Sequence, residues 1–426
     1  MATLSDLTGA EAIAMVGNHE ASVTDIAEAG LQRIAKREPV VHAFAHHRPT
    51  LVRQRAKELE RGDPALPLLG MTVAVKDLID TADYPTELGS RIHAGRRPER
   101  DAAVVRRLTE AGALIMGKTV TTEFALFEPG PTTNPLDVTR TPGGSSSGSA
   151  AATADRMVAA ALGTQTAGSV IRPAAFCGVL GFKPSFGAID RTGLQVVSPS
   201  LDTLGIFART VRDVALVFDR VRAARPDHTR PVRREGPPRI GFVRTSEWDM
   251  ADVETRHGLE ALADELATVG FGVVEATLPS SFADLVSMQV AVMEKEVGDT
   301  LCDHLARHAD LISDSTKALA RRGADQPEEV YARAQMAATA CRALLADVFS
   351  DLDGLLTPAV RGEASAGLAY TGDPVFCRVW TLLHTPTISL PLLTGPSGLP
   401  VGVQLVGRPD EDEALLDLAS ALMQRG

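Results

Sequence analysis

Aromatic residues are scarce in this sequence, at 4% of 426 residues, although 44% of the residues are hydrophobic. A core made from this composition must therefore consist mainly of Ala, Val and Leu. No uninterrupted apolar run approaches the roughly 20 residues that a membrane-spanning helix needs. The N-terminal segment also lacks the basic stretch and apolar stretch of a secretory signal. These absences predict a cytoplasmic globular protein with no membrane partner.

Cysteine is equally rare, and the cysteines present are far apart and lack CxxC spacing. A chain of this length can bury a large core and does not need disulfides to fold. The sequence therefore predicts buried free thiols rather than disulfides or a metal site. These thiols are Cys177, Cys302, Cys341 and Cys377.

The sequence has fewer positive than negative residues, with 43 Lys and Arg against 54 Asp and Glu, which gives a net charge of −11. Nonspecific affinity for nucleic acid comes chiefly from clustered Lys and Arg. We therefore expect no nucleic-acid partner and a small-molecule substrate.

The hydrophobic pattern predicts one large α/β domain over residues 1–426 without a clear linker or internal repeat. Residues 1–65 show helical periodicity and are predicted to form peripheral helices. Residues 66–220 alternate between strand and helix, and residues 240–426 add a second such half whose long helices cover a cleft. The predicted fold class is a large mixed β-sheet covered on both faces by helices.

Two short strands have predicted ends that matter for function. A β-branched run within Leu69–Ile79 predicts a buried strand that ends near Lys76. A second strand is predicted over Leu114–Met116, with a turn at Gly117–Thr119.

Two segments rich in Ser and Gly are the main candidates for chemistry, Thr141–Ala150 and Gly163–Pro173. Glycine allows close backbone approach, and successive free N–H groups can form a nest that stabilises an oxyanion. Burial at the end of an apolar strand would lower the pKa of Lys76 toward that of a usable base. Taken singly, each segment is better explained as a flexible loop, and Lys76 as a surface or salt-bridged residue beside Asp77 and Asp80.

Other catalytic arrangements fit less well. The GxSxG motif centred on Ser146 is typical of α/β-hydrolases, but that motif needs a hydrophobic strand directly before it and a histidine downstream. Histidines are available, although the preceding segment is polar and contains Pro135 and Pro142. Neither glycine-rich segment continues into GK[ST], and the His304 and His308 pair lacks the glutamate of a zincin. We expect no metal and no cofactor.

Three ordered motifs together resemble the amidase-signature family of serine amidohydrolases: VAVKDLI, TPGGSSSGSAAA and GTQTAGSVIRPAAFCGVLGFKPSFG. Flanking segments such as LDTLG from Leu201 and GLPVGVQLVGRPDEDEALL from Gly398 agree, so the resemblance covers most of the chain. It implies the amidase-signature fold and an enzyme that hydrolyses linear carbon–nitrogen amide bonds.

The resemblance also implies roles for individual residues. Lys76 would be the base, Ser145 the bridging serine after a cis peptide bond, and Ser169 the nucleophile that forms an acyl-enzyme. The backbone amides of the segment containing Ser169 would form the oxyanion hole. The residues implied besides Ser169 are Thr166, Ala167 and Gly168.

The sequence departs from the commonest family pattern in the third motif. Gln165 stands where many members have Asp, and Arg172 lies three rather than two residues after the nucleophile. This arrangement is similar to that of short, malonamidase-like members, in which the arginine binds a substrate carboxylate. Arg172 could equally hold its own loop to an acidic residue. The predicted substrate-binding residues are Arg172, Gly144, Ser146 and Thr164.

Three functional hypotheses follow from the resemblance. The leading one is a free-standing hydrolase that converts a small carboxamide, in one version carboxylate-bearing and malonamate-like, to an acid and ammonia or amine. The alternatives are the A subunit of a tRNA-dependent amidotransferase and a noncatalytic protein that binds a small amide. The long helices are compatible with a homodimer.

Overall fold

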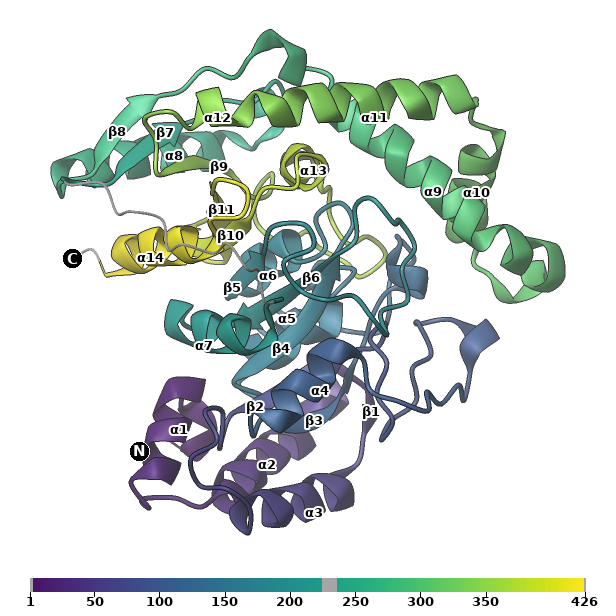
Figure 1. The fold of residues 1–426 in the computed structure, drawn as a ribbon, viewed down its shortest axis with the longest axis vertical. Helices are drawn as coiled ribbons and strands as arrows, with labels where there is room; N and C mark the ends of the chain where they lie inside the picture. The colour runs from purple at the N-terminus through teal and green to yellow at the C-terminus, as the bar shows by residue number, and fades with distance from the viewer. Residues whose placement is uncertain (1–2, 224–235, 425–426) are drawn as a thin grey trace.

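The computed structural model describes residues 3–223 and 236–424. These residues contain one mixed sheet of eleven strands with helices on both faces (Figure 1), which confirms the predicted fold class. The strands lie in the order β1-β3-β2-β4-β6-β5-β10-β11-β9-β7-β8. Their bounds are β1 Phe44–His47, β2 Thr72–Lys76, β3 Leu114–Thr119, β4 Ala160–Gln165, β5 Leu180–Lys183, β6 Thr203–Ala208, β7 Arg239–Phe242, β8 Gly272–Glu275, β9 Gly354–Pro358, β10 Thr387–Thr394 and β11 Pro400–Val406.

The sheet is parallel near its two ends and antiparallel in its centre. Strands β3, β2 and β4 run parallel, as do β9, β7 and β8. The strands between them, β6, β5, β10 and β11, pair antiparallel with their neighbours. Both predicted halves of the chain therefore contribute strands to one continuous sheet.

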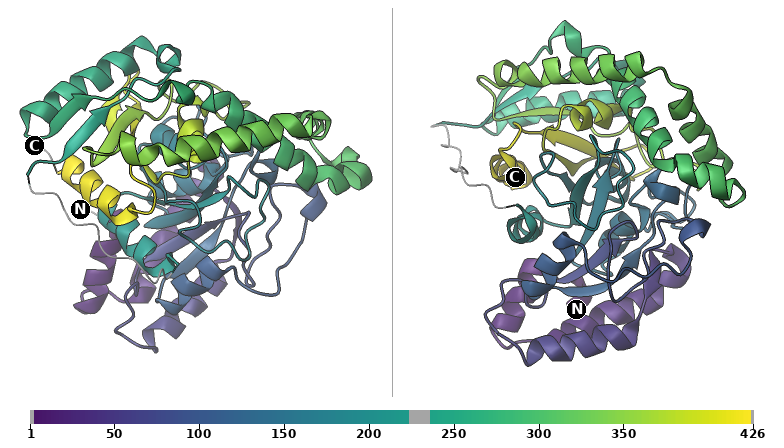
Figure 2. Two further views of the ribbon diagram at one scale, coloured as in Figure 1. Left: turned by 45° about the horizontal axis from the view of Figure 1, so that its top comes forward. Right: turned by 45° about the vertical axis from the view of Figure 1, so that its right-hand side comes forward.

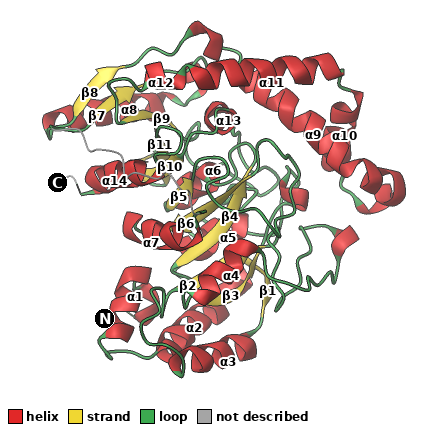
Figure 3. Cartoon of the chain, in the orientation of Figure 1, coloured by secondary structure: helices red, strands yellow, loops and turns green. Residues whose placement is uncertain are grey.

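Helices cover the sheet and extend beyond it, as the secondary-structure colouring of Figure 3 shows. Their bounds are α1 Gly9–Gly17, α2 Val23–Val41, α3 Pro49–Glu60, α4 Ala103–Glu110, α5 Ser147–Ala154, α6 Ile171–Cys177, α7 Val211–Val221, α8 Val253–Thr268, α9 Leu285–His308, α10 Asp314–Asp325, α11 Glu328–Ala343, α12 Leu345–Val348, α13 Val375–Leu382 and α14 Asp412–Met423. The N-terminal helices lie at one end of the molecule and α9, α10 and α11 at the other (Figure 2).

Side-chain alternation along β2 separates two hydrophobic clusters. Val73 and Val75 pack in the larger cluster with residues of α4, α7 and α14. Ala74 packs in the second cluster with residues of α2, α5 and α6. Because side chains alternate between the faces of a strand, Lys76 shares the face of Ala74. The end of β2 thus directs its lysine toward α5 and α6.

Several predicted elements differ from those observed. Strand β3 continues through Gly117–Thr119, where a turn was predicted, because these residues pair with both β2 and β1. The glycine that suggested a turn, Gly117, has a φ of +156° and follows an irregularity in the register, where Val73 pairs with Ile115 and Ala74 with Gly117. Helix α10, which packs against α9, was not predicted from the sequence.

The four cysteines are free thiols, but the prediction that all are buried is wrong for Cys302. That residue lies on α9 and is exposed, because only one side of this helix faces the core. In the part of the chain that the structure describes, no helix is both long and apolar enough to cross a membrane.

Candidate active site

The three motif residues lie at the ends of secondary-structure elements on one face of the sheet. Lys76 is the last residue of β2, Ser145 precedes α5, and Ser169 precedes α6. Helices α5 and α6 pack against each other. The peptide bond between Gly144 and Ser145 is cis. Segments almost a hundred residues apart in sequence are therefore brought to one place.

Lys76 is completely buried, and its ammonium group contacts hydroxyl groups. Its Nζ lies 2.8 Å from Ser145 Oγ and 2.7 Å from Thr164 Oγ1. Burial lowers the pKa of Lys76 to about 7, although the nearby Asp202 carboxylate opposes this shift. A pKa near neutrality allows the amine to be neutral and to accept a proton under ordinary conditions.

The loop that carries Ser169 presents free backbone amides. Among the described residues, no hydrogen-bond partner is found for the N–H groups of Ala167, Gly168 and Ser169. The next two amides, of Val170 and Ile171, donate to Gln165 Oε1 at 2.9 and 3.1 Å. Gln165 thus satisfies the start of α6 and leaves the preceding amides available for a ligand oxygen.

Gly168 is required by its surroundings. A Cβ atom at this position would lie 2.8 Å from Pro374 Cβ and 3.1 Å from Cys377 Cβ. Both neighbours belong to α13 and its N-terminal cap. The loop can therefore approach α13 closely only without a side chain.

Asp202 is a site residue that was not predicted from the sequence. Its buried carboxylate accepts hydrogen bonds from Thr166 Oγ1 and from the backbone amides of Val197 and Ser198. Burial raises the pKa of Asp202, whereas these hydrogen bonds lower it. Asp202 lies in the LDTLG segment, so the signal was present in the resemblance but no role was assigned to it.

Arg172 is almost completely buried on α6 and forms no ion pair with a described residue. Its Nη2 donates to the carbonyl oxygen of Gly144 at 2.7 Å and to Thr371 Oγ1 at 3.3 Å. Its Nε and Nη1 have no hydrogen-bond partner among the described residues. Arg172 thus holds the backbone next to Ser145, not an acidic side chain.

Ser146 and Thr164, two predicted substrate-binding residues, lie behind the serines. Ser146 Oγ donates to the Thr164 carbonyl oxygen at 3.2 Å and accepts from the Thr164 amide at 3.3 Å. Both residues are buried. No histidine contacts Ser146 within the described residues, so the geometry does not resemble the α/β-hydrolase alternative.

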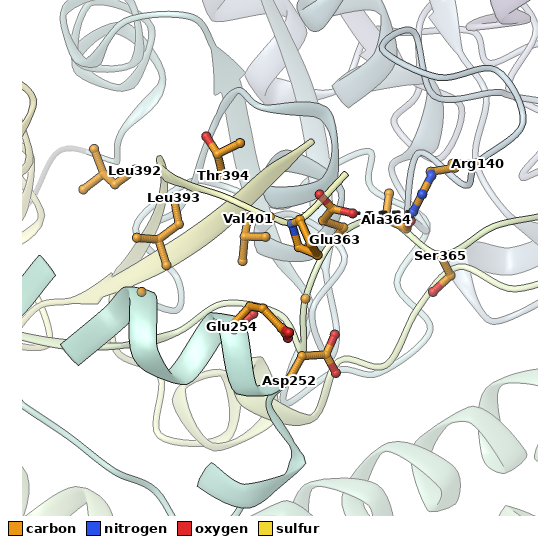
Figure 4. A pocket seen from close by; sticks show the side chains of 15 residues that line it. Arg140, Asp252, Glu254, Glu363, Ala364, Ser365, Leu392, Leu393, Thr394 and Val401 are labelled. Carbon is orange, nitrogen blue, oxygen red and sulfur yellow. Dashed lines mark hydrogen bonds and ion pairs between the residues drawn. The ribbon is translucent and has the colours of Figure 1, made fainter. Parts of the chain in front are cut away.

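A separate cavity of about 420 Å³ lies on the C-terminal half of the molecule, between the start of α8 and the segments around Glu363 and Leu393 (Figure 4). Arg140 reaches its rim and donates to the Ala364 carbonyl oxygen at 2.7 Å. None of the three motif residues lines this cavity. The buried catalytic candidates and this cavity are therefore separate features of the molecule.

Comparison with known proteins gives consistent matches over nearly the whole chain. The Amidase family model matches residues 25–416. The A subunit of the glutamyl-tRNA(Gln) amidotransferase of Anaeromyxobacter dehalogenans is 35% identical, with 97% of this chain and 94% of that protein covered. A crystal structure of an amidase superposes with a TM-score of 0.90 at 29% identity, covering 98% of this chain and all of that one.

A further structure, of a vestigial protein complex linked to the origins of an s-triazine catabolic enzyme, has a TM-score of 0.89 at 27% identity. It covers 98% of both chains.

These relatives correct one part of the predicted partners, the exclusion of nucleic acid; the small amide and the homodimer stay predictions. Several relatives are named as the A subunit of a tRNA-linked amidotransferase, so the exclusion of nucleic acid was wrong. The physical reason is that net charge is a sum over the whole surface. It does not describe local patches or the contribution of other subunits.

The family match and the fold together confirm the resemblance drawn from the three motifs, while closeness to malonamidase-like members stays a prediction. The chain belongs to the amidase family and is an enzyme that acts on amide bonds.

Proposed function

We propose that this enzyme hydrolyses a small carboxamide to a carboxylic acid and ammonia or amine through an acyl-enzyme on Ser169. The observation that carries the proposal is the buried contact of 2.8 Å between Lys76 Nζ and Ser145 Oγ. Arg172, three residues after Ser169, donates to the carbonyl oxygen of Gly144, the residue before Ser145. This contact supports a site in which the base, the bridging hydroxyl and the loop with free amides lie close together.

The first half of the reaction forms the acyl-enzyme. Neutral Lys76 accepts the Ser145 hydroxyl proton while Ser145 accepts the proton of Ser169. Ser169 Oγ attacks the amide carbon, and the free amides of the loop stabilise the negative oxygen of the tetrahedral intermediate. Collapse of the intermediate breaks the carbon–nitrogen bond. The relay returns the proton to the departing nitrogen, because an amide anion is too basic to leave.

The second half hydrolyses the acyl-enzyme by the same groups. A water molecule gives its proton to the relay and attacks the acyl carbon. The tetrahedral intermediate then releases the acid as Ser169 regains its proton. The contact of 2.7 Å between Lys76 Nζ and Thr164 Oγ1 supports this cycle, because it holds the amine in place in both protonation states.

Arg172 supports a substrate that carries a carboxylate. Its unpaired Nε and Nη1 groups lie on the helix that follows Ser169, and a buried guanidinium without a paired anion is costly. We therefore propose a carboxylate-bearing amide rather than malonamate in particular, since a guanidinium recognises the carboxylate and not the rest of the substrate.

The relatives favour a particular setting for this chemistry, in which the chain releases ammonia for an amidotransferase that acts on tRNA. This candidate rests on matches that cover nearly all of both proteins. The free-standing hydrolase is the second candidate. It is supported by the amidase crystal structure, whose whole chain aligns with this one. It is also supported by the alignment with the amidotransferase subunit of Anaeromyxobacter dehalogenans, which spans 468 positions and so exceeds the 426 residues of this chain. The amidotransferase relative thus contains segments that this chain lacks. The free thiols support a cytoplasmic setting for either candidate.

The test is ammonia release from succinamate, glutamine, butanamide and an aryl amide by the wild type, Ser169→Ala and the matched control Ser146→Ala. We expect turnover that is lost in Ser169→Ala and largely kept in Ser146→Ala. The assay is repeated with the other subunits and the tRNA of the Anaeromyxobacter dehalogenans enzyme. Turnover that requires these additions supports the amidotransferase, and turnover without them the hydrolase. Full activity in Ser169→Ala would contradict both.

A further inference from the structure

Two carbonyl groups of the loop before Ser169 accept hydrogen bonds from side chains of the second half of the chain. Gln289 Nε2 on α9 donates to the Thr166 carbonyl oxygen at 2.9 Å. Thr381 Oγ1 on α13 donates to the Ala167 carbonyl oxygen at 2.8 Å. Neither Gln289 nor Thr381 belongs to the three sequence motifs.

The orientation of the Gln289 side chain is fixed by its other partner. Arg378 Nη1 donates to Gln289 Oε1, and a guanidinium can only donate. The amide nitrogen of Gln289 must therefore be the end that faces Thr166. Gln289 is completely buried, so water does not compete for this contact.

Thr381 is held in a similar way. Gln165 Nε2 donates to Thr381 Oγ1 at 2.9 Å, which leaves the hydroxyl proton of Thr381 for an acceptor. The Ala167 carbonyl oxygen is the nearer acceptor, at 2.8 Å, and the Cys377 carbonyl oxygen lies at 3.0 Å. The side chain is buried.

A trans peptide unit is planar, so its N–H group points away from its carbonyl group. A donor that holds the Thr166 carbonyl therefore fixes the direction of the Ala167 N–H. A donor that holds the Ala167 carbonyl fixes the Gly168 N–H in the same way. Both of these N–H groups lack a partner among the described residues.

We propose that Gln289 and Thr381 are positioning residues that aim the amides of Ala167 and Gly168 at the oxyanion of the tetrahedral intermediate. The inference rests on the proposed function. It assigns a catalytic contribution to α9 and α13, which reach the loop from the half of the chain without motifs. A preoriented donor acts mainly on the transition state, because charge develops on the oxygen only there.

The test uses variants that remove one donated hydrogen bond with little change of shape. Gln289→Glu keeps the acceptor for Arg378 but loses the donor to Thr166. Thr381→Val loses its hydroxyl, and Thr381→Ser keeps it. The matched controls are Gln404→Glu and Thr385→Val, because these buried side chains donate to carbonyl groups outside the loop.

We expect Gln289→Glu and Thr381→Val to lower kcat by about 10- to 1,000-fold with KM changed less than about threefold. Affinity for a boronic-acid analogue of the tetrahedral intermediate should fall in parallel, while affinity for the carboxylate product should not. Thr381→Ser and both controls should stay near the wild type in each measurement. Thermal unfolding checks that the variants are folded. If Gln289→Glu does not fold, the test rests on Thr381→Val.

Equal losses in kcat and in product affinity, or losses in the controls as large as in the variants, would overturn the inference. Unchanged kcat in both Gln289→Glu and Thr381→Val would also overturn the inference. If Ser169→Ala is inactive in the same assay, the proposed function remains intact. If the wild type neither hydrolyses any amide nor reacts at Ser169 with a fluorophosphonate, the proposed function and this inference both fail.

Discussion

Two lysines on neighbouring strands are both completely buried, yet their surroundings differ. Lys76 ends β2 and contacts the hydroxyl groups of Ser145 and Thr164. Lys118 on β3 lies beside Val75 in the sheet register and so points to the opposite face. Its Nζ donates to the Ile79 carbonyl oxygen at 2.7 Å and to Thr86 Oγ1 at 2.6 Å, and it lies 3.5 Å from a carboxylate oxygen of Asp77.

The comparison shows that burial alone does not make a lysine a base. Burial lowers the pKa of both groups, to about 7 for Lys76 and about 8 for Lys118. Lys118 also has one hydroxyl partner, but its carbonyl and carboxylate partners can only accept and therefore require a donor. A hydroxyl can accept or donate, so the partners of Lys76 suit both the neutral amine and the ammonium. The chemical type of the partners therefore distinguishes Lys76, which can carry a proton, from Lys118, which serves as a structural cation.

The largest expected effect is on turnover. Lys76→Met should lower kcat by about 10³-fold or more, because Lys76 is the only group among the described residues that contacts Ser145 Oγ and can take its proton. Lys118→Met removes an equally buried lysine and should leave kcat within about tenfold of the wild type in the folded protein. Steady-state hydrolysis of one amide substrate by both variants is the measurement. Equal losses in the two variants would show that the partner argument is wrong.

The second effect is on stability and runs in the opposite order. Lys118→Met should lower the free energy of unfolding by about 3 kcal/mol, because it leaves the buried Asp77 carboxylate without its cation. Lys76→Met should change this free energy by only about 1 kcal/mol, because hydroxyl groups lose one neutral partner. Urea denaturation of both variants provides the comparison. A Lys76 variant that is the less stable of the two would contradict it.

The third effect is on pH dependence. Protonated Lys76 cannot accept a proton, so kcat/KM should fall by about tenfold per pH unit below the pKa and level off above pH of about 7. The positive charge of Arg172 disfavours protonation of Lys76. Arg172→Gln should therefore raise this pKa and move the acidic limb to higher pH by about one unit or less. The limb should stay in place in Lys118→Met, and a limb that moves only in that variant would assign it to Lys118.

Local signals in the sequence were enough to predict much of the fold. The end of a buried strand at Lys76 follows from a short β-branched run, and β2 ends at that residue. The predicted turn at Gly117–Thr119 failed, because pairing with strands on both sides outweighed the local preference of glycine. Helix α10 was missed because its stability depends on packing against α9, which leaves a weaker local pattern.

The residues of the candidate site also differ in whether the sequence carries a local signal for them. The motifs identified Lys76, Ser145 and Ser169 because their residue types and order are specific. Gln289 and Thr381 carry no such signal, since a glutamine and a threonine within helices of the second half have ordinary structural roles. Asp202 stood inside a recognised segment, but its contact with Thr166 depends on the packing of β6 against β4.

The sequence by itself determined the family, the fold class and the residue types available for amide hydrolysis, because these depend on local pattern and on ordered motifs. Only the tertiary structure decided that the partners of Lys76 are hydroxyl groups, whereas Lys118 also contacts a carbonyl and a carboxylate oxygen. It also decided which distant side chains hold the loop before Ser169. Both depend on contacts between segments far apart in the chain, and such contacts are set by the packing of the whole sheet and its helices.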